Sequence, residues 1–161
     1  MLLTAIHFHY AGFVLPLLTG MAGRIVGGRT AGLAAVGVVA AVPLVAVGIT
    51  STQVGLPALL ECLAAWLMAL SGLLASWLHL RLAARNGRPR AVRSLWAVAG
   101  LSLAFGMVLA ALYGARSLGG PTWLDIPTMR AWHGTADALG FGLAGVVGWS
   151  LVRGPITETA A

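Results

Sequence analysis

Three polar side chains in the last apolar run of the chain have a spacing that suits proton chemistry. Arg130, His133 and Asp137 are three and then four residues apart, so a helix carries all of them on one face. Desolvation disfavours the charged form of a carboxyl, so Asp137 among apolar residues can hold a proton and act as a general acid. An i, i+4 pair of His133 and Asp137 that only ties helices together is the alternative. Arg130 fits a substrate clamp and an interface anchor equally well.

A second group of polar residues lies near the start of the chain and at the start of the third apolar run. Glu61 is the other carboxyl inside an apolar run, and it is a second candidate acid, a paired base, or a helix-start acid stabilised by the macrodipole. His7 and His9 are two residues apart, so their side chains diverge by roughly 160° on a helix and cannot both face one ligand. The predicted catalytic residues are therefore Asp137, Glu61, His133 and His9. The predicted substrate contacts are His7, Phe8, Tyr10, Trp66, Arg130 and Trp132.

The composition indicates that membrane-spanning helices must position these residues. Of the 161 residues, 59% are hydrophobic and 9% are charged, and the mean hydropathy is +0.92. Soluble domains carry about 25% charged residues, which excludes a soluble enzyme, a disordered segment and a nucleic-acid module. The single cysteine, Cys62, excludes an internal disulfide and a cysteine-rich metal site.

The apolar runs predict an all-α bundle of five transmembrane helices in one domain that covers residues 1–161. At roughly 20 residues per crossing, the predicted spans are about 2–22, 31–49, 58–80, 94–113 and 130–152. The polar residues 50–53 predict a break after the second span. The glycine- and proline-rich stretch 114–129 predicts a loop, in which Asp125 and Pro127 fit a helix cap.

The arginines predict the orientation of the bundle. All ten basic residues are arginine, and eight of them fall on one side of a five-span chain: Arg24, Arg29, Arg81, Arg85, Arg88, Arg90, Arg93 and Arg153. The positive-inside rule then places the N-terminus outside and the C-terminus in the cytoplasm. With this orientation Glu61, His133, Asp137 and the residues near the N-terminus share the outer half of the membrane, whereas His79 lies at the inner end as an interface residue. Shared depth strengthens the prediction of a site, because ionisable residues within a membrane usually face the bundle interior.

Two short runs resemble a known family. The run from His7 to Phe13, followed by Leu-Pro-Leu, looks like the opening of the conserved C-terminal region of the YndJ-like integral membrane proteins. The run from Trp132 to Gly142 looks like that family's second signature, a His-Gly followed by Asn-Ala-x-Gly-Phe. The resemblance implies the fold and the importance of both ends of the chain, and it implies no defined activity. Asp137 stands where the family's asparagine is expected, and an amide cannot donate an acid proton.

Three functions fit these residues. The first is a membrane enzyme, comparable to terpene and meroterpenoid cyclases of secondary metabolism, that cyclises or isomerises an isoprenoid-type substrate such as an epoxide. Asp137 or Glu61 would protonate the substrate, aromatic faces would stabilise the cations, and His9 or His133 would take the final proton, without a cofactor or metal. The second is a haem or metal protein that uses His7 or His9 with His133. The third is a proton-coupled transporter subunit, which would require homo-oligomers because five spans are few.

The expected partners follow from the same composition. They are a lipophilic small molecule and the lipid bilayer, and nucleic acid is excluded because the arginines are confined to the gaps between apolar runs. We expect a multi-pass protein of a bacterial cell membrane.

Overall fold

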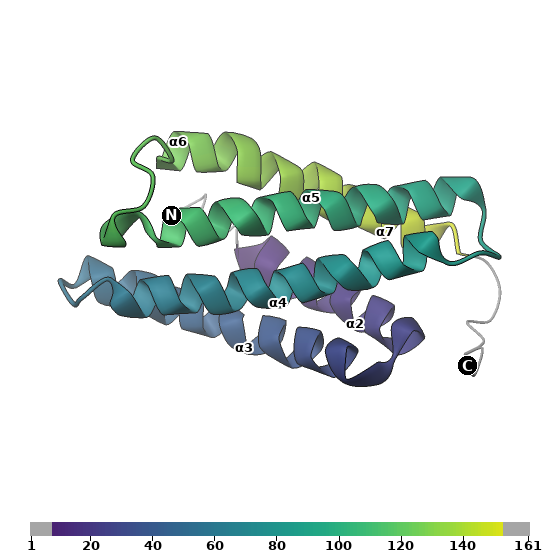
Figure 1. Ribbon diagram of the computed structural model, residues 1–161, viewed down its shortest axis with the longest axis horizontal. Helices are drawn as coiled ribbons and strands as arrows, with labels where there is room; N and C mark the ends of the chain where they lie inside the picture. The colour runs from purple at the N-terminus through teal and green to yellow at the C-terminus, as the bar shows by residue number, and fades with distance from the viewer. Residues whose placement is uncertain (1–7, 153–161) are drawn as a thin grey trace.

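The computed structural model describes residues 8–152, and they form a bundle of five helical rods in which successive rods run in opposite directions (Figure 1). The first rod has a π-helical turn, η1 (Tyr10–Val14), that continues into α2 (Leu15–Val26). The next three rods are α3 (Gly28–Gln53), α4 (Leu59–Ala84) and α5 (Arg90–Gly114). The short 3-10 turn η2 (Arg116–Leu118) follows. No strand occurs between residues 8 and 152, so the prediction of an all-helical fold is confirmed for this range.

The last rod changes its helical type along its length. It consists of α6 (Ile126–Met129), the π-helical segments η3 (Arg130–Gly134) and η4 (Ala136–Leu143), and α7 (Ala144–Ser150). The residues at its three junctions keep right-handed helical backbone angles, so the rod winds on from Ile126 to Ser150. The sequence analysis assumed an ordinary α-helix here and did not predict the wider turns.

Three of the rods, α3, α4 and α5, are long and apolar enough to cross a membrane. They extend beyond the predicted apolar runs at one or both ends, because the polar residues that flank a run still continue the helix. The predicted break at residues 50–53 is wrong in this respect, since α3 continues to Gln53. The hydroxyls of Thr50, Ser51 and Thr52 bond back to carbonyls of Ala46 and Gly48, which satisfies them without leaving the helix. The chain turns only at Gly55, whose φ of 87° favours glycine.

Small residues allow the rods to approach closely. Gly72 of α4 faces the sulfur of Met107 on α5, and the Ser76 hydroxyl donates to the Gly100 carbonyl of α5 over 2.7 Å. Gly140 and Gly148 of the last rod face Ser102 and Trp96 of α5. These small residues of the last rod therefore contact α5, and their size lets the two helices approach closely.

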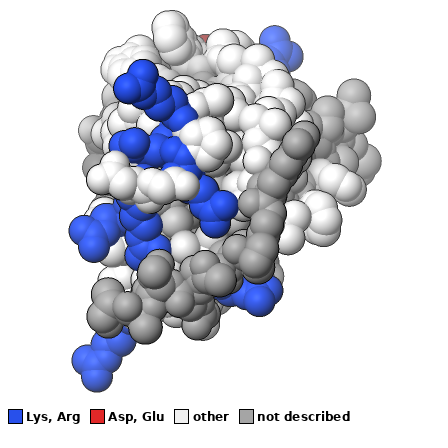
Figure 2. Space-filling model, turned by 90° about the vertical axis from the view of Figure 1, so that its right-hand side faces the viewer, with Lys and Arg blue, Asp and Glu red and all other residues white. Residues whose placement is uncertain are grey.

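One end of the bundle is strongly basic. Figure 2 shows this end, where arginine side chains gather around the two turns that join α2 to α3 and α4 to α5. Arg85 donates to the Ile25 carbonyl and Arg93 donates to the Ala83 carbonyl, so two of these arginines also satisfy the C-terminal carbonyls of helices. Arg116 and Arg130 lie at the other end. The unequal distribution of arginines in the sequence thus corresponds to two different ends of the folded bundle.

The predicted interface position of His79 is wrong. The sequence analysis placed it at the interface beside the arginines, but its side chain is fully buried in the core. Its Nδ1 lies 2.9 Å from the Ala75 carbonyl, and its ring meets the edge of Phe141 with 5.4 Å between the ring centroids. An exposed position would have left the Phe141 ring without this packing partner on α4.

Candidate functional site

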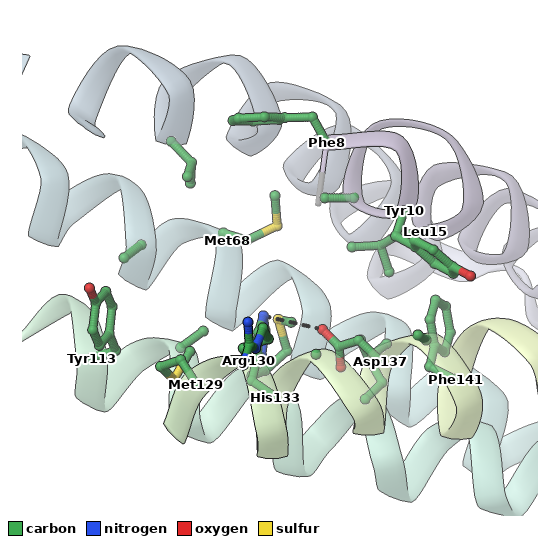
Figure 3. A pocket seen from close by; sticks show the side chains of 18 of the residues that line it. Phe8, Tyr10, Leu15, Met68, Tyr113, Met129, Arg130, His133, Asp137 and Phe141 are labelled. Carbon is green, nitrogen blue, oxygen red and sulfur yellow. Dashed lines mark ion pairs between the residues drawn. The ribbon is translucent and has the colours of Figure 1, made fainter. Parts of the chain in front are cut away.

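A cavity of about 580 Å³ lies inside the bundle, toward the end away from the arginine cluster, and every rod contributes to its wall (Figure 3). Its size falls within the range of about 300–1,000 Å³ that is usual for small-molecule sites. Its wall is mainly apolar, with contributions from Leu15 of α2, Val42 of α3, Met68 of α4 and Leu103 of α5. Polar side chains enter this wall at a few positions, and most of them come from the last rod.

Several of the polar and aromatic side chains of the cavity lie in the π-helical segments. Tyr10 belongs to η1, His133 to η3 and Asp137 to η4, and all three line the cavity. A π-turn adds a residue to the helical turn, is rare, and occurs frequently at functional sites. The π-helical segments thus fall in the two regions that the sequence predicted to be functional, near the start of the chain and in the last rod.

His133 and Asp137 form a pair that must share a proton. The Nδ1 of His133 lies 2.9 Å from the carbonyl oxygen of Gly106 on α5, and a carbonyl only accepts, so Nδ1 carries a hydrogen. This leaves Nε2 facing Oδ2 of Asp137 at 3.5 Å. A bare Nε2 opposite a carboxylate would place two lone pairs together. The pair therefore keeps one proton between these atoms, on the imidazole or on the carboxyl.

Gly106 of α5 lies against both His133 and Asp137. A Cβ at this position would contact Oδ1 of Asp137 and would lie 3.2 Å from Nδ1 of His133. Only a residue without a side chain leaves room for both groups against the α5 backbone. Oδ1 of Asp137 is buried there without a hydrogen bond in the described part of the chain, while Oδ2 points toward His133.

Glu61 lies in the same cavity wall, and it is already paired. Its Oε1 accepts a hydrogen bond from Arg116 over 2.7 Å. Arg116 also donates to the Tyr113 carbonyl and stacks 4.0 Å above the centre of the Tyr113 ring. The guanidinium is thus held on three sides, and its charge balances that of Glu61. This pairing favours a structural role for Glu61 over that of a free acid.

The structure brings together some of the other predicted site residues and separates the rest. Phe8, Tyr10 and Arg130 line the cavity. His9 is exposed and does not line the cavity, so within residues 8–152 it does not face His133 as a second haem or metal ligand would. His7 lies outside the described residues.

Two predicted aromatic contacts are on the outside of the bundle. Trp66 is 41% exposed and donates its ring N–H to the Ala111 carbonyl. Trp132 is 58% exposed and packs edge-on against Phe105. Neither is part of the cavity wall. The cavity obtains aromatic surface from Tyr113 and Phe141 instead.

Several residues of the site were missed by the sequence analysis. Tyr113, Arg116, Gly106 and Phe141 were not among the predicted site residues. Only Arg116 had a usable signal, because it and Glu61 lie at the same end of adjacent antiparallel helices. Gly106 and Phe141 are ordinary residues of an apolar helix, and their roles follow from packing.

Asp125 is a helix cap, as predicted. Its Oδ1 accepts a hydrogen bond from the Thr128 amide over 2.8 Å at the start of α6. Hydrogen bonds from the Thr128 side chain and amide hold the pKa of Asp125 below its ordinary value. This carboxyl is exposed and is not part of the cavity wall.

Comparison with known proteins gives one match. The model of the YndJ-like protein family matches residues 1–141, which include the first run of the resemblance, the second run except Gly142, and the residues that line the cavity. No curated protein and no solved structure matches the chain.

Proposed function

We propose that this chain, which belongs to the YndJ-like protein family, is a membrane-embedded enzyme that isomerises or cyclises a lipophilic substrate by acid–base catalysis. The observation that carries the proposal is the His133–Asp137 pair, whose Nε2 and Oδ2 lie 3.5 Å apart inside a mainly apolar cavity.

The membrane setting is supported by the outer surface of the bundle. On α3, the outward side chains of Leu33, Val36 and Val39 are between 60% and 70% exposed. A soluble helix would present polar residues on this face, whereas a membrane span is apolar all round. We propose five crossings, made by the five rods, with the arginine end in the cytoplasm as the positive-inside rule directs.

The shared proton supports general acid–base catalysis. Asp137 would donate a proton to an alkene or epoxide of the substrate, and the resulting cation would rearrange. A C–H bond of the rearranged cation would then release a proton to Nε2 of His133, which returns it to Asp137. The proton is recovered in each cycle, so the product is an isomer of the substrate. The low-polarity wall protects the cation from water.

Aromatic rings in the cavity wall could stabilise such a cation. Phe8, Tyr10 and Phe141 line the same cavity as Asp137 (Figure 3). Ring faces attract cations, and the attraction is stronger where water is excluded. These three rings take the role that the sequence analysis assigned in part to Trp66 and Trp132.

The test compares two carboxyls of the same chain. Asp137→Asn removes the proton donor with little change in volume, and it introduces the residue that the family resemblance leads one to expect. Asp125→Asn is the matched control, because it makes the same change outside the cavity. Membranes that contain each variant are supplied with epoxidised prenyl substrates, and the products are separated and identified by mass.

We expect new isomers of the substrate with the unaltered chain and with Asp125→Asn, and a loss of at least about a hundredfold with Asp137→Asn, as removal of a general acid commonly causes. Full activity of Asp137→Asn would refute the acid role. Activity lost equally in both variants would show that the effect is not specific to the cavity.

A further inference from the structure

The cavity carries an unbalanced positive charge at its mouth. Arg130 lines the cavity and its side chain is exposed, so it lies where the cavity meets the surroundings of the bundle. Figure 3 shows it on the same rod as His133 and Asp137. No ion pair or hydrogen bond joins its guanidinium to another described residue.

The other charged groups of the cavity neutralise one another. Glu61 is paired with Arg116 at 2.7 Å. The His133–Asp137 pair is neutral overall wherever its shared proton resides. Arg130 therefore remains as one positive charge, and none of the residues 8–152 in the wall supplies a free anion that would balance it.

The nearest acid in the sequence does not supply this anion. Asp125 is exposed, lies outside the cavity wall, and uses its Oδ1 to cap the Thr128 amide. A charge that lines a mainly apolar cavity is stabilised by an opposite charge, and a guanidinium binds carboxylate and phosphate oxygens with two parallel hydrogen bonds.

We infer that the cavity binds an amphiphile whose anionic head, a carboxylate or phosphate, is held by Arg130 at the mouth and whose apolar tail lies inside. The inference rests on the proposed function and names its substrate class. The anion keeps contact with water at the exposed Arg130, so it avoids the cost of burial in an apolar interior. The tail meets the apolar wall around Leu103 and Met107 of α5.

The helical spacing also gives the distance between the head and the reacting atoms. His133 and Asp137 are three and seven residues beyond Arg130, which at the α-helical rise of about 1.5 Å per residue corresponds to at most roughly 5 and 10 Å along the rod, since the wider π-helical turns rise less per residue. The proton pair would therefore act on substrate atoms about 5–10 Å from the anionic head. The expected substrate therefore has a phosphate or carboxylate at one end and a double bond or epoxide at that distance from it.

The test measures binding with a pair of probes that differ only in the head group. Radiolabelled farnesyl phosphate and farnesol are titrated onto the purified full chain in neutral detergent, by scintillation proximity. Arg130→Gln removes the charge at the mouth, and Arg130→Lys keeps it. Arg90→Gln is the matched control, because it removes an exposed arginine at the opposite end of the bundle.

We expect Arg130→Gln to weaken farnesyl phosphate binding by about tenfold or more, as loss of a charge-assisted hydrogen bond predicts. Farnesol binding should be unchanged, Arg130→Lys should retain most of the affinity, and Arg90→Gln should alter neither probe. Equal affinity of the two probes for the unaltered chain, or an equal loss of both in Arg130→Gln, would overturn the inference.

A cavity-filling variant separates this inference from the proposed function. Ala110→Phe and Ala138→Phe each place a ring in the cavity wall, and two variants are used in case one does not fold. If they abolish binding of both probes while Arg130→Gln changes neither, the cavity binds lipophiles and only the anionic head is refuted. If well-folded cavity variants bind both probes normally, the cavity is not the binding site, and the proposed function fails with the inference.

The source of the anion is identified in lipid nanodiscs. If a bilayer lipid supplies it, discs of phosphatidylglycerol should reduce farnesyl phosphate binding relative to discs of phosphatidylcholine, and Arg130→Gln should remove this difference. Unchanged binding in both discs identifies a free amphiphile. Either result is consistent with an anionic head on Arg130.

Discussion

Gly106→Ala tests whether the proton pair is held against α5 as the structure shows. An added Cβ would contact Oδ1 of Asp137, and it would lie 3.0 Å from Cγ of Asp137 and 3.2 Å from Nδ1 of His133. Overpacking of this kind costs about 1–3 kcal/mol. Replacement of glycine by alanine inside a helix raises the free energy of unfolding by about 1 kcal/mol, because alanine has the higher helix propensity. We therefore expect a net loss of about 0–2 kcal/mol in the free energy of unfolding.

Gly32→Ala is the matched control for this substitution. Gly32 is an exposed residue within α3, and a Cβ there would have no neighbour within 4 Å. This variant should gain about 1 kcal/mol from helix propensity alone. The difference in the free energy of unfolding between the two alanine variants then measures the cost of the steric overlap at Gly106, which we expect to be about 1–3 kcal/mol.

The assay is unfolding in mixed micelles by increasing mole fractions of dodecyl sulfate, followed by tryptophan emission. A double-mutant cycle with Asp137→Ala identifies the group responsible, because neighbours that interact give non-additive effects. In the Asp137→Ala background, Gly106→Ala should cost much less than it does in the unaltered chain. An equal cost in both backgrounds, or a Gly106→Ala variant as stable as Gly32→Ala, would refute the described geometry.

Three further predictions concern the other polar groups. Glu61→Gln should lower the free energy of unfolding by about 1 kcal/mol because it leaves Arg116 unpaired, and a cycle with Arg116→Gln should show less than additive loss; full additivity would mean that the ion pair contributes nothing. His79→Leu should cost no more than about 1 kcal/mol in the same assay, because Nε2 is buried without a hydrogen bond in the described residues and an apolar side chain removes that penalty; a larger loss would indicate a partner for this nitrogen. Because hydrogen bonds from the side chain and amide of Thr128 hold the pKa of Asp125 below its ordinary value of 3.8, its stabilising effect is present above pH 3.8 and is lost as the pH falls through the lowered pKa. Protection of the Thr128 amide from exchange, measured relative to its intrinsic rate at each pH, should fall in that acid range, and an identical fall in Asp125→Asn would contradict the assignment.

The fold was largely predictable because its signals are local. Apolar runs of about 20 residues indicated the rods, and the arginines indicated which turns share an end of the bundle. The errors at residues 50–53 and at His79 have a common cause. Both predictions treated a polar side chain as evidence of an exposed position, whereas a hydroxyl or an imidazole can bond to a carbonyl of the preceding helical turn.

The sequence predicted how far along its rod each site residue lies, but it did not predict in which direction the side chain points. The position of a residue along its rod follows from counting at about 1.5 Å per residue, so the sequence placed Glu61, His133 and Asp137 near the same end. The direction in which a side chain points depends on how the rod is rotated against its neighbours and on the π-turns of the last rod. Trp66 and Trp132 have a suitable depth and nevertheless point outward.

By itself, the sequence determined that the chain forms apolar helices with one basic end, because hydropathy and charge act along the chain and need no partner. It also determined which few residues could do chemistry, because so few are polar. Only the tertiary structure decided that Glu61 is paired with Arg116, that His133 presents Nε2 to Asp137, and that Arg130 has no counter-ion within the described part of the chain. These facts depend on contacts between rods that are far apart in the sequence, and the close packing of small residues such as Gly106 determines which atoms meet.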